Sequence, residues 1–264
     1  MPDITSSHNP RLKAAVKLRD RRERVREGRF LIDGRREIER ALAASVAVAE
    51  AFVKDDAEQA VKIAPLMHQL RRAGASILLT APAPFGKLAF GDRDEGMVAV
   101  AVTPQTSLAS LALPPNPLVA VLAGIEKPGN IGAVLRTADA AGVSAVIVAD
   151  GGTDLYNPNA IRASLGAIFT VPVCAASSAE TLAWLKQQGL AVFAARVDGA
   201  IDYASASYRG PSAIILGSEA HGLSDHWSGP EVVAISLPML GAVDSLNVSA
   251  TAAVLCYEVA RQRR

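Results

Sequence analysis

Short, continuous apolar runs alternate with helix-patterned segments along the second half of the chain. Strands are predicted at residues 118–123, 144–149, 170–174, 190–194, 213–216 and 232–236. The intervening segments repeat their apolar positions at helical spacing, which predicts helices at residues 131–141, 158–168, 179–188 and 246–261. Strands that are apolar on both faces and separated by helices are typical of a parallel sheet covered on both sides, so the pattern predicts an α/β fold.

The first part of the chain shows a second, smaller set of elements. The pattern predicts helices at residues 9–27, 35–44, 63–73 and 85–90, and strands at residues 29–33, 46–53, 76–80 and 96–102. Residues 104–117 then carry four prolines and no charged residue, which favours an extended connection over a helix. We therefore expect a domain at residues 1–103, a linker at residues 104–117 and a second domain at residues 118–264.

The composition limits the class of protein. Half of the 264 residues are hydrophobic and 20% are charged, which is the balance of a globular chain. No apolar run approaches the roughly 18 residues of a membrane span, and the first residues lack the pattern of a signal peptide. Cys174 and Cys256 lie in apolar segments, and the four histidines lack metal-ligand spacing. We expect a cytoplasmic protein with two buried thiols, no disulfide, no metal site and no membrane contact.

Positive charge is concentrated near the N-terminus, although the whole chain carries a net charge of only +1. Residues 11–29 contain nine Lys and Arg against three Asp and Glu. A localised basic stripe is typical of a surface that contacts the phosphate backbone of a nucleic acid, although a solvated charged helix has the same composition. The candidate RNA contacts are Arg11, Lys13, Lys17, Arg19, Arg21 and Arg22.

Three loops in the second half lie beside predicted strand ends and carry unusual residues. They occupy residues 124–132 (GIEKPGNIG), 217–222 (GSEAHG) and 237–249 (LPMLGAVDSLNVS). In a parallel sheet a ligand usually lies beyond the carboxyl ends of the strands, and glycine lets the backbone approach it closely. The sequence lacks a Gly-x-Gly-x-x-Gly turn opening a helix and a Gly-Lys-Ser/Thr phosphate loop, which disfavours a nicotinamide- or ATP-dependent enzyme.

These loops resemble the three motifs of the SpoU (TrmH-like) family of RNA 2′-O-ribose methyltransferases, within the knotted methyltransferases. The first motif corresponds to residues 130–138 (NIGAVLRTA), the second to residues 216–223 (LGSEAHGL) and the third to residues 237–249. Residues 162–167 (RASLGA) resemble the family's segment between the first two motifs. Because the motifs occur in order at family-like separations, the resemblance covers nearly all of residues 118–264.

The resemblance implies an α/β domain with a deep trefoil knot, S-adenosylmethionine held among the knot loops, and a homodimer with sites near its interface. The implied reaction is methyl transfer to a ribose 2′-hydroxyl of structured RNA. The N-terminal domain is similar to the L30e-like RNA-binding module, on residues 4–7, 9, 17–18 and 29–31. Since the resembling modules grip ribosomal RNA hairpins, 23S-type ribosomal RNA is expected ahead of tRNA.

The resemblance also carries the family's functional residues onto this chain. The expected catalytic residues are Arg136, Asn130, Glu219, Ser245 and Asn247, and the expected cofactor contacts are Gly217, Leu237, Met239, Leu246 and Leu216. Each also has a purely structural interpretation: the asparagines and the serine as helix caps, Asn130 for a helix starting at residue 131, and the leucines as core residues. His221 lies near the motifs and is expected to be a variable loop residue, although an imidazole suits proton transfer and is worth testing.

Two roles stay open for Arg136. The family proposal assigns it the activation of the ribose hydroxyl, but a guanidinium with a pKa above about 12 is a poor base. Its planar fork suits a phosphate contact and the stabilisation of a developing alkoxide. The alternatives to a ribosomal RNA methyltransferase are a tRNA 2′-O-methyltransferase, a knotted RNA-binding assembly factor without catalysis, and a small-molecule enzyme on a doubly wound sheet.

Overall fold

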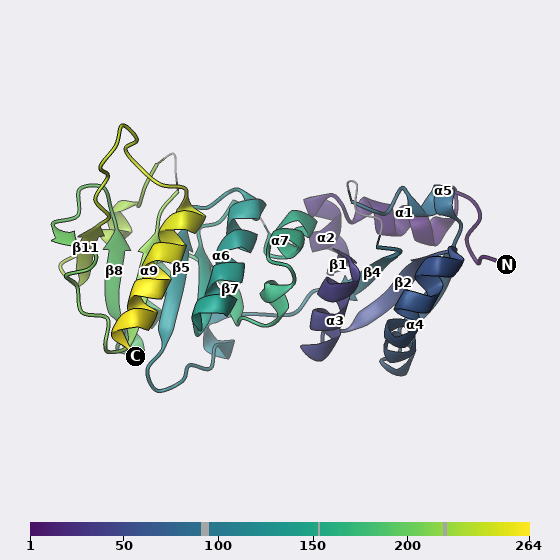
Figure 1. Ribbon diagram of the computed structural model, residues 1–264, viewed down its shortest axis with the longest axis horizontal. Helices are drawn as coiled ribbons and strands as arrows, with labels where there is room; N and C mark the ends of the chain where they lie inside the picture. The colour runs from purple at the N-terminus through teal and green to yellow at the C-terminus, as the bar shows by residue number, and fades with distance from the viewer. Residues whose placement is uncertain (91–94, 153, 219–220) are drawn as a thin grey trace. The chain divides into compact units, whose positions relative to one another are not determined.

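The computed structural model describes residues 1–90, 95–152, 154–218 and 221–264. The chain forms two compact units, each built around its own sheet (Figure 1). The first unit comprises Met1–Gln105 and Tyr156–Thr170, and the second comprises Thr106–Leu155 and Val171–Arg264.

The described residues of the first unit form a four-stranded mixed sheet in the order β1-β4-β2-β3. Strand β4 is antiparallel to both of its neighbours, and β2 is parallel to β3. The strands are β1 (Arg29–Asp33), β2 (Val48–Lys54), β3 (Ser76–Thr80) and β4 (Met97–Val102). The helices are α1 (Pro10–Lys17), α2 (Arg21–Glu27), α3 (Arg35–Ala43), α4 (Ala57–Arg72), α5 (Pro82–Phe85) and, later in the chain, α7 (Pro158–Ala163) and the 3-10 turn η2 (Ala167–Phe169). The strands predicted at residues 29–33 and 76–80 are confirmed to the residue.

The single basic helix predicted at residues 9–27 is wrong, because the segment forms two helices. Helix α2 begins after Asp20, whose carboxylate accepts the backbone N–H of Arg22 at 2.7 Å. The buried side chain of Arg24 holds the break by donating to the carbonyls of Leu18 and Arg19 at 2.8 and 2.7 Å. Residues 19–24 are all charged, so the apolar periodicity carries no signal for the turn.

In the second unit, the described residues form a seven-stranded sheet whose neighbouring strands are all parallel. The strand order is β7-β6-β5-β10-β8-β11-β9. The strands are β5 (Leu118–Ala123), β6 (Ala145–Ala149), β7 (Val173–Ala176), β8 (Ala191–Ala195), β9 (Ile201–Asp202), β10 (Ser212–Leu216) and β11 (Val232–Ser236). The helices are α6 (Pro128–Ala141), α8 (Ser178–Gln187) and α9 (Val248–Gln262), with the 3-10 turns η1 (Leu108–Ser110) and η3 (Asp225–Trp227). The predicted parallel α/β sheet is confirmed, while the two-residue strand β9 is too short to show a period.

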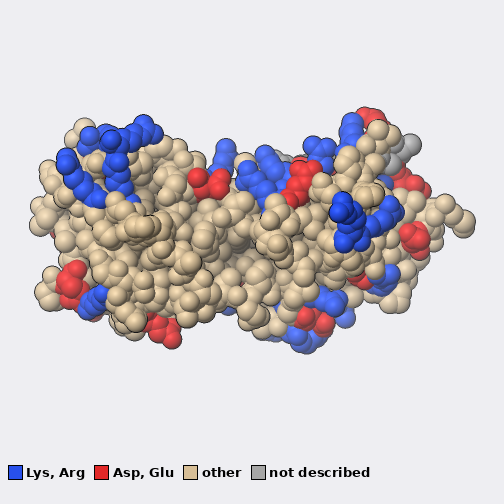
Figure 2. Space-filling model, turned by 90° about the horizontal axis from the view of Figure 1, so that it is seen from below, with Lys and Arg blue, Asp and Glu red and all other residues tan. Residues whose placement is uncertain are grey.

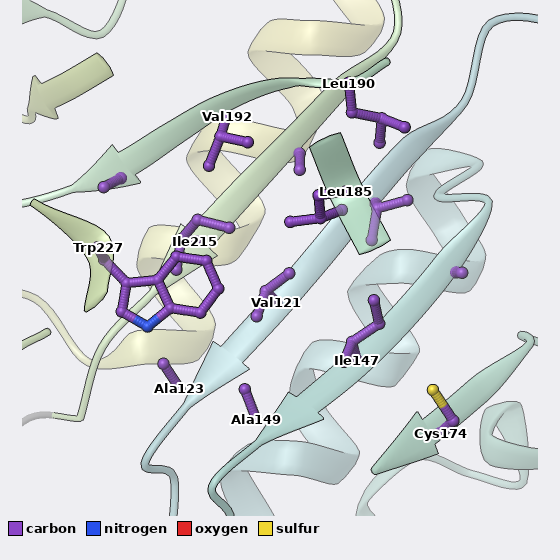
Figure 3. Packing of buried hydrophobic residues seen from close by; sticks show 14 residues of the cluster. Val121, Ala123, Ile147, Ala149, Cys174, Leu185, Leu190, Val192, Ile215 and Trp227 are labelled. Atoms are coloured by element: carbon purple, nitrogen blue, oxygen red, sulfur yellow. The ribbon is translucent and has the colours of Figure 1, made fainter. Parts of the chain in front are cut away.

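One face of this sheet packs on a continuous apolar core (Figure 3). Val121, Ile147 and Ile215 come from adjacent strands and present their side chains on this face. Leu185 of α8 and Trp227 of η3 complete the cluster, and both are fully buried. This packing holds the strands in place, so their carboxyl ends form a rigid edge on which a site can be built.

The expected linker at residues 104–117 packs in part onto that core. Leu108, Leu111 and Leu113 are partly buried against the cluster. The division between the units falls at Gln105 and Thr106, so most of the expected linker belongs to the second unit. Its leucines cover apolar surface of the sheet, which gives the segment a fixed position there.

The segment Tyr156–Thr170 belongs to the first unit although it lies between β6 and β7 in the sequence. The ring of Phe30 on β1 stands 4.7 Å from that of Tyr156 and 6.1 Å from that of Phe169, measured between centroids. This grouping differs from the expected domain at residues 118–264. The apolar pattern of a helix does not indicate which sheet the helix covers, so the sequence offered no signal that residues 156–170 belong to the first unit.

Helices α6 and α9 lie side by side on the second sheet (Figure 1). Each follows a parallel strand in the chain, α6 after β5 and α9 after β11, so both begin at the edge where the strands end. Val134 and Leu135 of α6 are buried, as are Leu255 and Cys256 of α9. This packing brings the start of the first motif beside the end of the third.

Candidate active site

A pocket of about 810 Å³ opens where three adjacent strands of the second sheet end. Its walls are the residues that follow β8, β10 and β11, together with the start of α9. Because these strands are parallel neighbours, their carboxyl ends meet at one edge. The expected site residues that line it are Leu216, Gly217, Leu237, Met239, Ser245 and Leu246.

Gly217 forms part of the wall, and a side chain cannot be accommodated there. A Cβ atom at this position would lie 2.5 Å from both the carbonyl carbon and the oxygen of Gly222. Ser218 and Gly222 exchange backbone hydrogen bonds of 3.1 and 2.9 Å, which hold the two ends of this loop together. Two backbone segments thus pack directly against each other beside the pocket, which only glycine allows at this position.

Two asparagines from the first and third motifs meet at the edge of this pocket. The Nδ2 of Asn247 donates to the Oδ1 of Asn130 at 3.5 Å. Asn247 is the N-cap of α9, as expected, and its Oδ1 accepts the backbone N–H of Ser249 at 2.9 Å. It stands between Leu246 and Val248, which both line the pocket.

The expected capping role of Asn130 is wrong. Helix α6 begins at Pro128 with Lys127 as its N-cap, so Asn130 lies within the first helical turn. The proline fits the first position of a helix, where its missing N–H costs no hydrogen bond. Asn130 can therefore direct its side chain toward Asn247 instead of its own backbone. Ser245 is also not a cap: it lines the pocket, and its hydroxyl donates to Asp244 at 3.3 Å.

Arg136 lies on α6 with an exposed side chain, and it is not among the residues that line the pocket. Its guanidinium has no ion pair or hydrogen bond with any residue that the structure describes. An exposed arginine without a protein partner can bind an anion with its full fork of donors.

The second motif is described in part. Glu219 lies outside the described residues. His221 lines the pocket with an exposed side chain, and its backbone N–H donates to the Ser218 hydroxyl at 3.1 Å.

The sequence interpretation missed the loop after β8. Arg196 and Asp198 line the pocket, and the Nε and Nη2 atoms of Arg196 donate to the two carboxylate oxygens of Asp198 at 2.8 Å each. Arg196 also donates to the hydroxyl of Ser228 at 2.7 Å. The hydrogen bond from Arg196 lowers the pKa of Asp198, which keeps a carboxylate at the pocket. The signal that could have found this loop is its place at a strand end, since it lacks the glycine pattern of the other three.

The basic N-terminal residues have different surroundings. Arg11 pairs with Glu50 at 2.6 Å, and Arg19 donates to the carbonyls of Leu88 and Ala89 at 3.0 and 2.6 Å. Arg21 has a protein contact as well. The remaining three expected contacts make no ion pair within residues 1–90, 95–152, 154–218 and 221–264: Lys13, Lys17 and Arg22. On the face shown in Figure 2, Lys and Arg side chains are interspersed with Asp and Glu.

The described residues contain no group of three or more His, Cys, Asp or Glu arranged to hold a metal ion. Within the same part of the chain, every helix is too short or too polar to cross a membrane. Cys174 and Cys256 are free and buried, as predicted. Burial raises the pKa of the Cys174 thiol to about 11 and that of Cys256 to about 12, so neither is a reactive thiolate.

Comparison with known families decides the class. The SpoU rRNA Methylase family model matches residues 117–257, which is more than half of the chain. This chain belongs to the SpoU rRNA methylase family. The MRM3-like substrate binding domain matches residues 9–99, in the region where the sequence predicted an RNA-binding domain. The family resemblance drawn from the three motifs is confirmed.

Similar proteins of this family match the chain over nearly its whole length. RlmP of Bacillus subtilis (strain 168), a 23S rRNA (guanosine(2553)-2′-O)-methyltransferase, is 27% identical over 98% of this chain and 99% of RlmP. The crystal structure of an RNA 2′-O ribose methyltransferase is 42% identical, with a TM-score of 0.83 and coverage of 98% of both chains. AviRb from Streptomyces viridochromogenes, a SpoU methyltransferase solved in complex with AdoMet, is 26% identical, with a TM-score of 0.87 over 97% of this chain and 98% of AviRb. The predicted α/β fold of the SpoU knotted methyltransferases is thus confirmed.

Proposed function

We propose that this chain transfers the methyl group of S-adenosylmethionine to a ribose 2′-hydroxyl of 23S-type ribosomal RNA. The observation that carries the proposal is the hydrogen bond from Asn247 to Asn130, since Asn247 stands between Leu246 and Val248, which both line the 810 Å³ pocket. It places amide groups that can hold a ribose directly beside a cavity of cofactor size. The relatives support the substrate, since RlmP acts on 23S rRNA and AviRb was solved with AdoMet.

The pocket fits S-adenosylmethionine in size and chemistry. Its volume lies in the range of about 300–1,000 Å³ typical of small-molecule sites. Leu216 and Leu237 offer an apolar surface to an adenine ring, and the bare backbone at Gly217 allows the ring to approach closely. The carboxylate of Asp244 offsets the positive charge of a sulfonium, whereas that of Asp198 is already paired with Arg196. When bound, the cofactor supplies the activated methyl group.

The asparagine pair orients the ribose in this proposal. Both side chains stand at the start of a helix, where unpaired backbone N–H groups favour the approach of negative charge. The hydrogen bond between them fixes the orientation of the two side-chain amides. Their remaining N–H and C=O groups can then bind a substrate in one orientation. The pair is therefore suited to hold a hydroxyl oxygen whose negative charge increases during the reaction.

Arg136 binds an RNA phosphate and stabilises the developing alkoxide. The 2′-oxygen loses its proton as it bonds to the methyl carbon, so a positive charge nearby lowers the energy of that step. The guanidinium suits this electrostatic role, whereas it is a poor acceptor of the proton. Its exposure and its lack of a protein partner among the described residues leave all of its donors for RNA.

The proposal includes a homodimer, and a cytoplasmic location follows from the proposed ribosomal RNA substrate. Support for the dimer comes from apolar side chains exposed on the second unit. Val254 and Tyr257 on α9 are 37% and 50% exposed, and Leu240 in the preceding loop is 98% exposed. Val254 and Tyr257 are three residues apart, so they lie on one face of α9, and a contiguous exposed apolar patch marks a protein interface. Light scattering of a Val254→Asp/Tyr257→Asp variant should give a monomer mass where the native chain gives a dimer; a native monomer contradicts the dimer.

The test of the function is a map of ribose methylation in cells with and without the gene. The proposal predicts one or a few 2′-O-methyl positions in 23S rRNA that vanish on deletion and return with the native gene. Loss of a tRNA position instead would favour the tRNA enzyme. No change in any RNA, with ribosome assembly delayed, would favour the assembly factor.

A further inference from the structure

The first unit contains a second pocket, of about 250 Å³, on the side of its sheet that α1 and α2 cover. Ala15, Leu18 and Val100 form an apolar floor, and all three are buried. Basic side chains stand around this floor. The pocket lies within the first unit alone, so it is separate from the methyl-transfer site described above.

Three cations reach this pocket from two different elements. Lys13 and Lys17 are four residues apart on α1, so they stand one turn apart on one face of the helix. Arg29 begins β1 and lies on the same face of that strand as Leu31, because side chains alternate along a strand. Leu31 pairs in register with Val100 of the floor, which explains why Arg29 faces the same pocket.

The acidic residues of the pocket wall are all engaged in ion pairs within the protein. Glu50 pairs with Arg11 at 2.6 Å. Glu23 and Glu27 both pair with Arg26, at 2.5 and 2.9 Å. Three carboxylates are thus paired with two cations, Arg11 and Arg26, which leaves about one negative charge in the wall.

The three cations have no such balance. Lys13, Lys17 and Arg29 form neither an ion pair nor a side-chain hydrogen bond with any part of the chain that the structure describes. These three cations outweigh the one carboxylate charge left over by the shared Arg26, so the pocket presents excess positive charge above an apolar floor. This combination suits a ligand that is anionic at one end and flat and apolar at the other.

We propose that this pocket takes one unstacked nucleotide of the RNA substrate, with its flanking phosphates at Lys13, Lys17 and Arg29 and its base on the apolar floor. The inference rests on the proposed function, which supplies the RNA. The small volume fits a single base and excludes a duplex, and proteins that bind RNA loops commonly hold bases turned out of the stack. The first unit would then select single-stranded or looped segments near the nucleotide to be methylated.

The test uses the full chain and a fluorescent single-stranded oligoribonucleotide of mixed sequence, about 12 nucleotides long. The variant Lys13→Gln/Lys17→Gln removes two pocket charges, and Arg72→Gln/Lys87→Gln removes two exposed charges of the same unit outside the pocket. The pocket variant should bind about tenfold more weakly, and the slope of log affinity against log salt should fall by about 1.4, or about 0.7 for each phosphate that is no longer neutralised. The control variant should stay within about twofold of the native chain. Equal weakening in the two variants would overturn the pocket in favour of diffuse charge.

A third variant tests the base rather than the phosphates. Ala14 lines the pocket from an exposed position on α1, so Ala14→Leu adds bulk there without changing charge or helix propensity greatly. The proposal expects weaker binding of the single strand with an unchanged salt slope. Native affinity in this variant, or equally tight binding of the same strand as a duplex, would overturn it. Circular dichroism checks that each variant is folded.

The inference and the proposed function fail in different ways. If the pocket is wrong, the pocket and control variants methylate 23S rRNA with the same KM. If the function is wrong, the native chain forms no 2′-O-methyl product whatever RNA it binds.

Discussion

The side-chain amide of Asn247 donates to Asn130 at 3.5 Å, although the two residues are 117 positions apart in the sequence. Each stands at the start of a helix, and the two helices pack side by side. The contact joins the first and third motifs beside the pocket. A residue that both caps a helix and contacts the site has two separable roles, and substitutions can distinguish them.

Asn247→Ser separates capping from catalysis. Serine caps a helix about as well as asparagine, but its hydroxyl is too short to reach Asn130, so we expect native thermal stability with at least a roughly tenfold loss of kcat. Asn247→Ala should lose the cap as well, at about 1 kcal/mol. Thermal denaturation and methyl-transfer kinetics measure the two effects. Full activity in the serine variant would mean that the amide has no part in the reaction.

Gly217→Ala tests the close approach in the second motif. The added Cβ would meet backbone atoms of Gly222 at 2.5 Å, and backbone cannot rotate away as a side chain can. We expect the turn to shift and S-adenosylmethionine to bind at least about tenfold more weakly by calorimetry, since the backbone at this point is part of the pocket wall. Gly210→Ala is the matched control, because a Cβ there has no atom within 4 Å. Equal affinities of the two variants would contradict this assignment.

The buried carboxyl group of Asp33 should make the stability of the first unit depend on pH. Its side chain is buried at the end of β1 and accepts the Phe90 N–H at 2.7 Å. Burial raises the pKa of Asp33 from 3.8 to about 6; nearby Glu95 and Glu37 add to the rise, while the Phe90 N–H and Arg162 oppose it. The folded state therefore binds the proton more tightly than the unfolded state. Stability should fall as the pH rises from about 4 to 6, by at most about 3 kcal/mol.

Hydrogen exchange of the β1 and β4 amides, corrected for its intrinsic pH dependence, measures this effect within the first unit. The native chain should be better protected at pH 5 than at pH 7.5. Asp33→Asn, which keeps an acceptor for Phe90 without the charge, should remove the difference and be the more stable form at pH 7.5. Equal protection of the native chain at pH 5 and pH 7.5 would show that ionisation of Asp33 does not destabilise the first unit. An asparagine variant that is still better protected at pH 5 would show the same.

The buried strands could be predicted from the sequence because a strand covered on both faces has a continuous apolar run. Strand β5 and strand β11 lie where the pattern placed them. The prediction of a single basic helix failed for the opposite reason, since residues 19–24 are all charged and the side-chain bond from Arg24 to Leu18 leaves no trace in the apolar pattern. The start of α6 was missed although Pro128, a residue that fits the first turn of a helix, marks it.

The site was predicted to the extent that its residues lie in motifs. Gly217 and Leu246 share one pocket as the resemblance implied. Asp198 carries no motif and enters the pocket only because β8 lies between β10 and β11, an order that the sequence does not reveal. The same limit applies to Tyr156, whose ring packs on Phe30 of the first sheet although it follows a strand of the second. Local patterns give elements, while contacts between distant elements decide which of them share a site.

Arg136 can be tested as a phosphate and alkoxide contact by comparing two substitutions. Arg136→Lys keeps the charge but loses the bidentate fork, so it should retain a small part of the activity, while Arg136→Ala should lose at least roughly a hundredfold in kcat. S-adenosylmethionine affinity should stay within about twofold in both, because Arg136 does not line the pocket. Weaker cofactor binding in proportion to the reduced activity would place the arginine in the cofactor site instead.

The most direct measurement is the identity of the methylated nucleoside. The purified chain is incubated with 23S rRNA and S-adenosylmethionine carrying a labelled methyl group, and the RNA is digested to nucleosides for mass spectrometry. Our account predicts label in a 2′-O-methylnucleoside, and none above background with Arg136→Ala. Label on a base, or no label in any nucleoside while the native chain binds both RNA and cofactor, would contradict it.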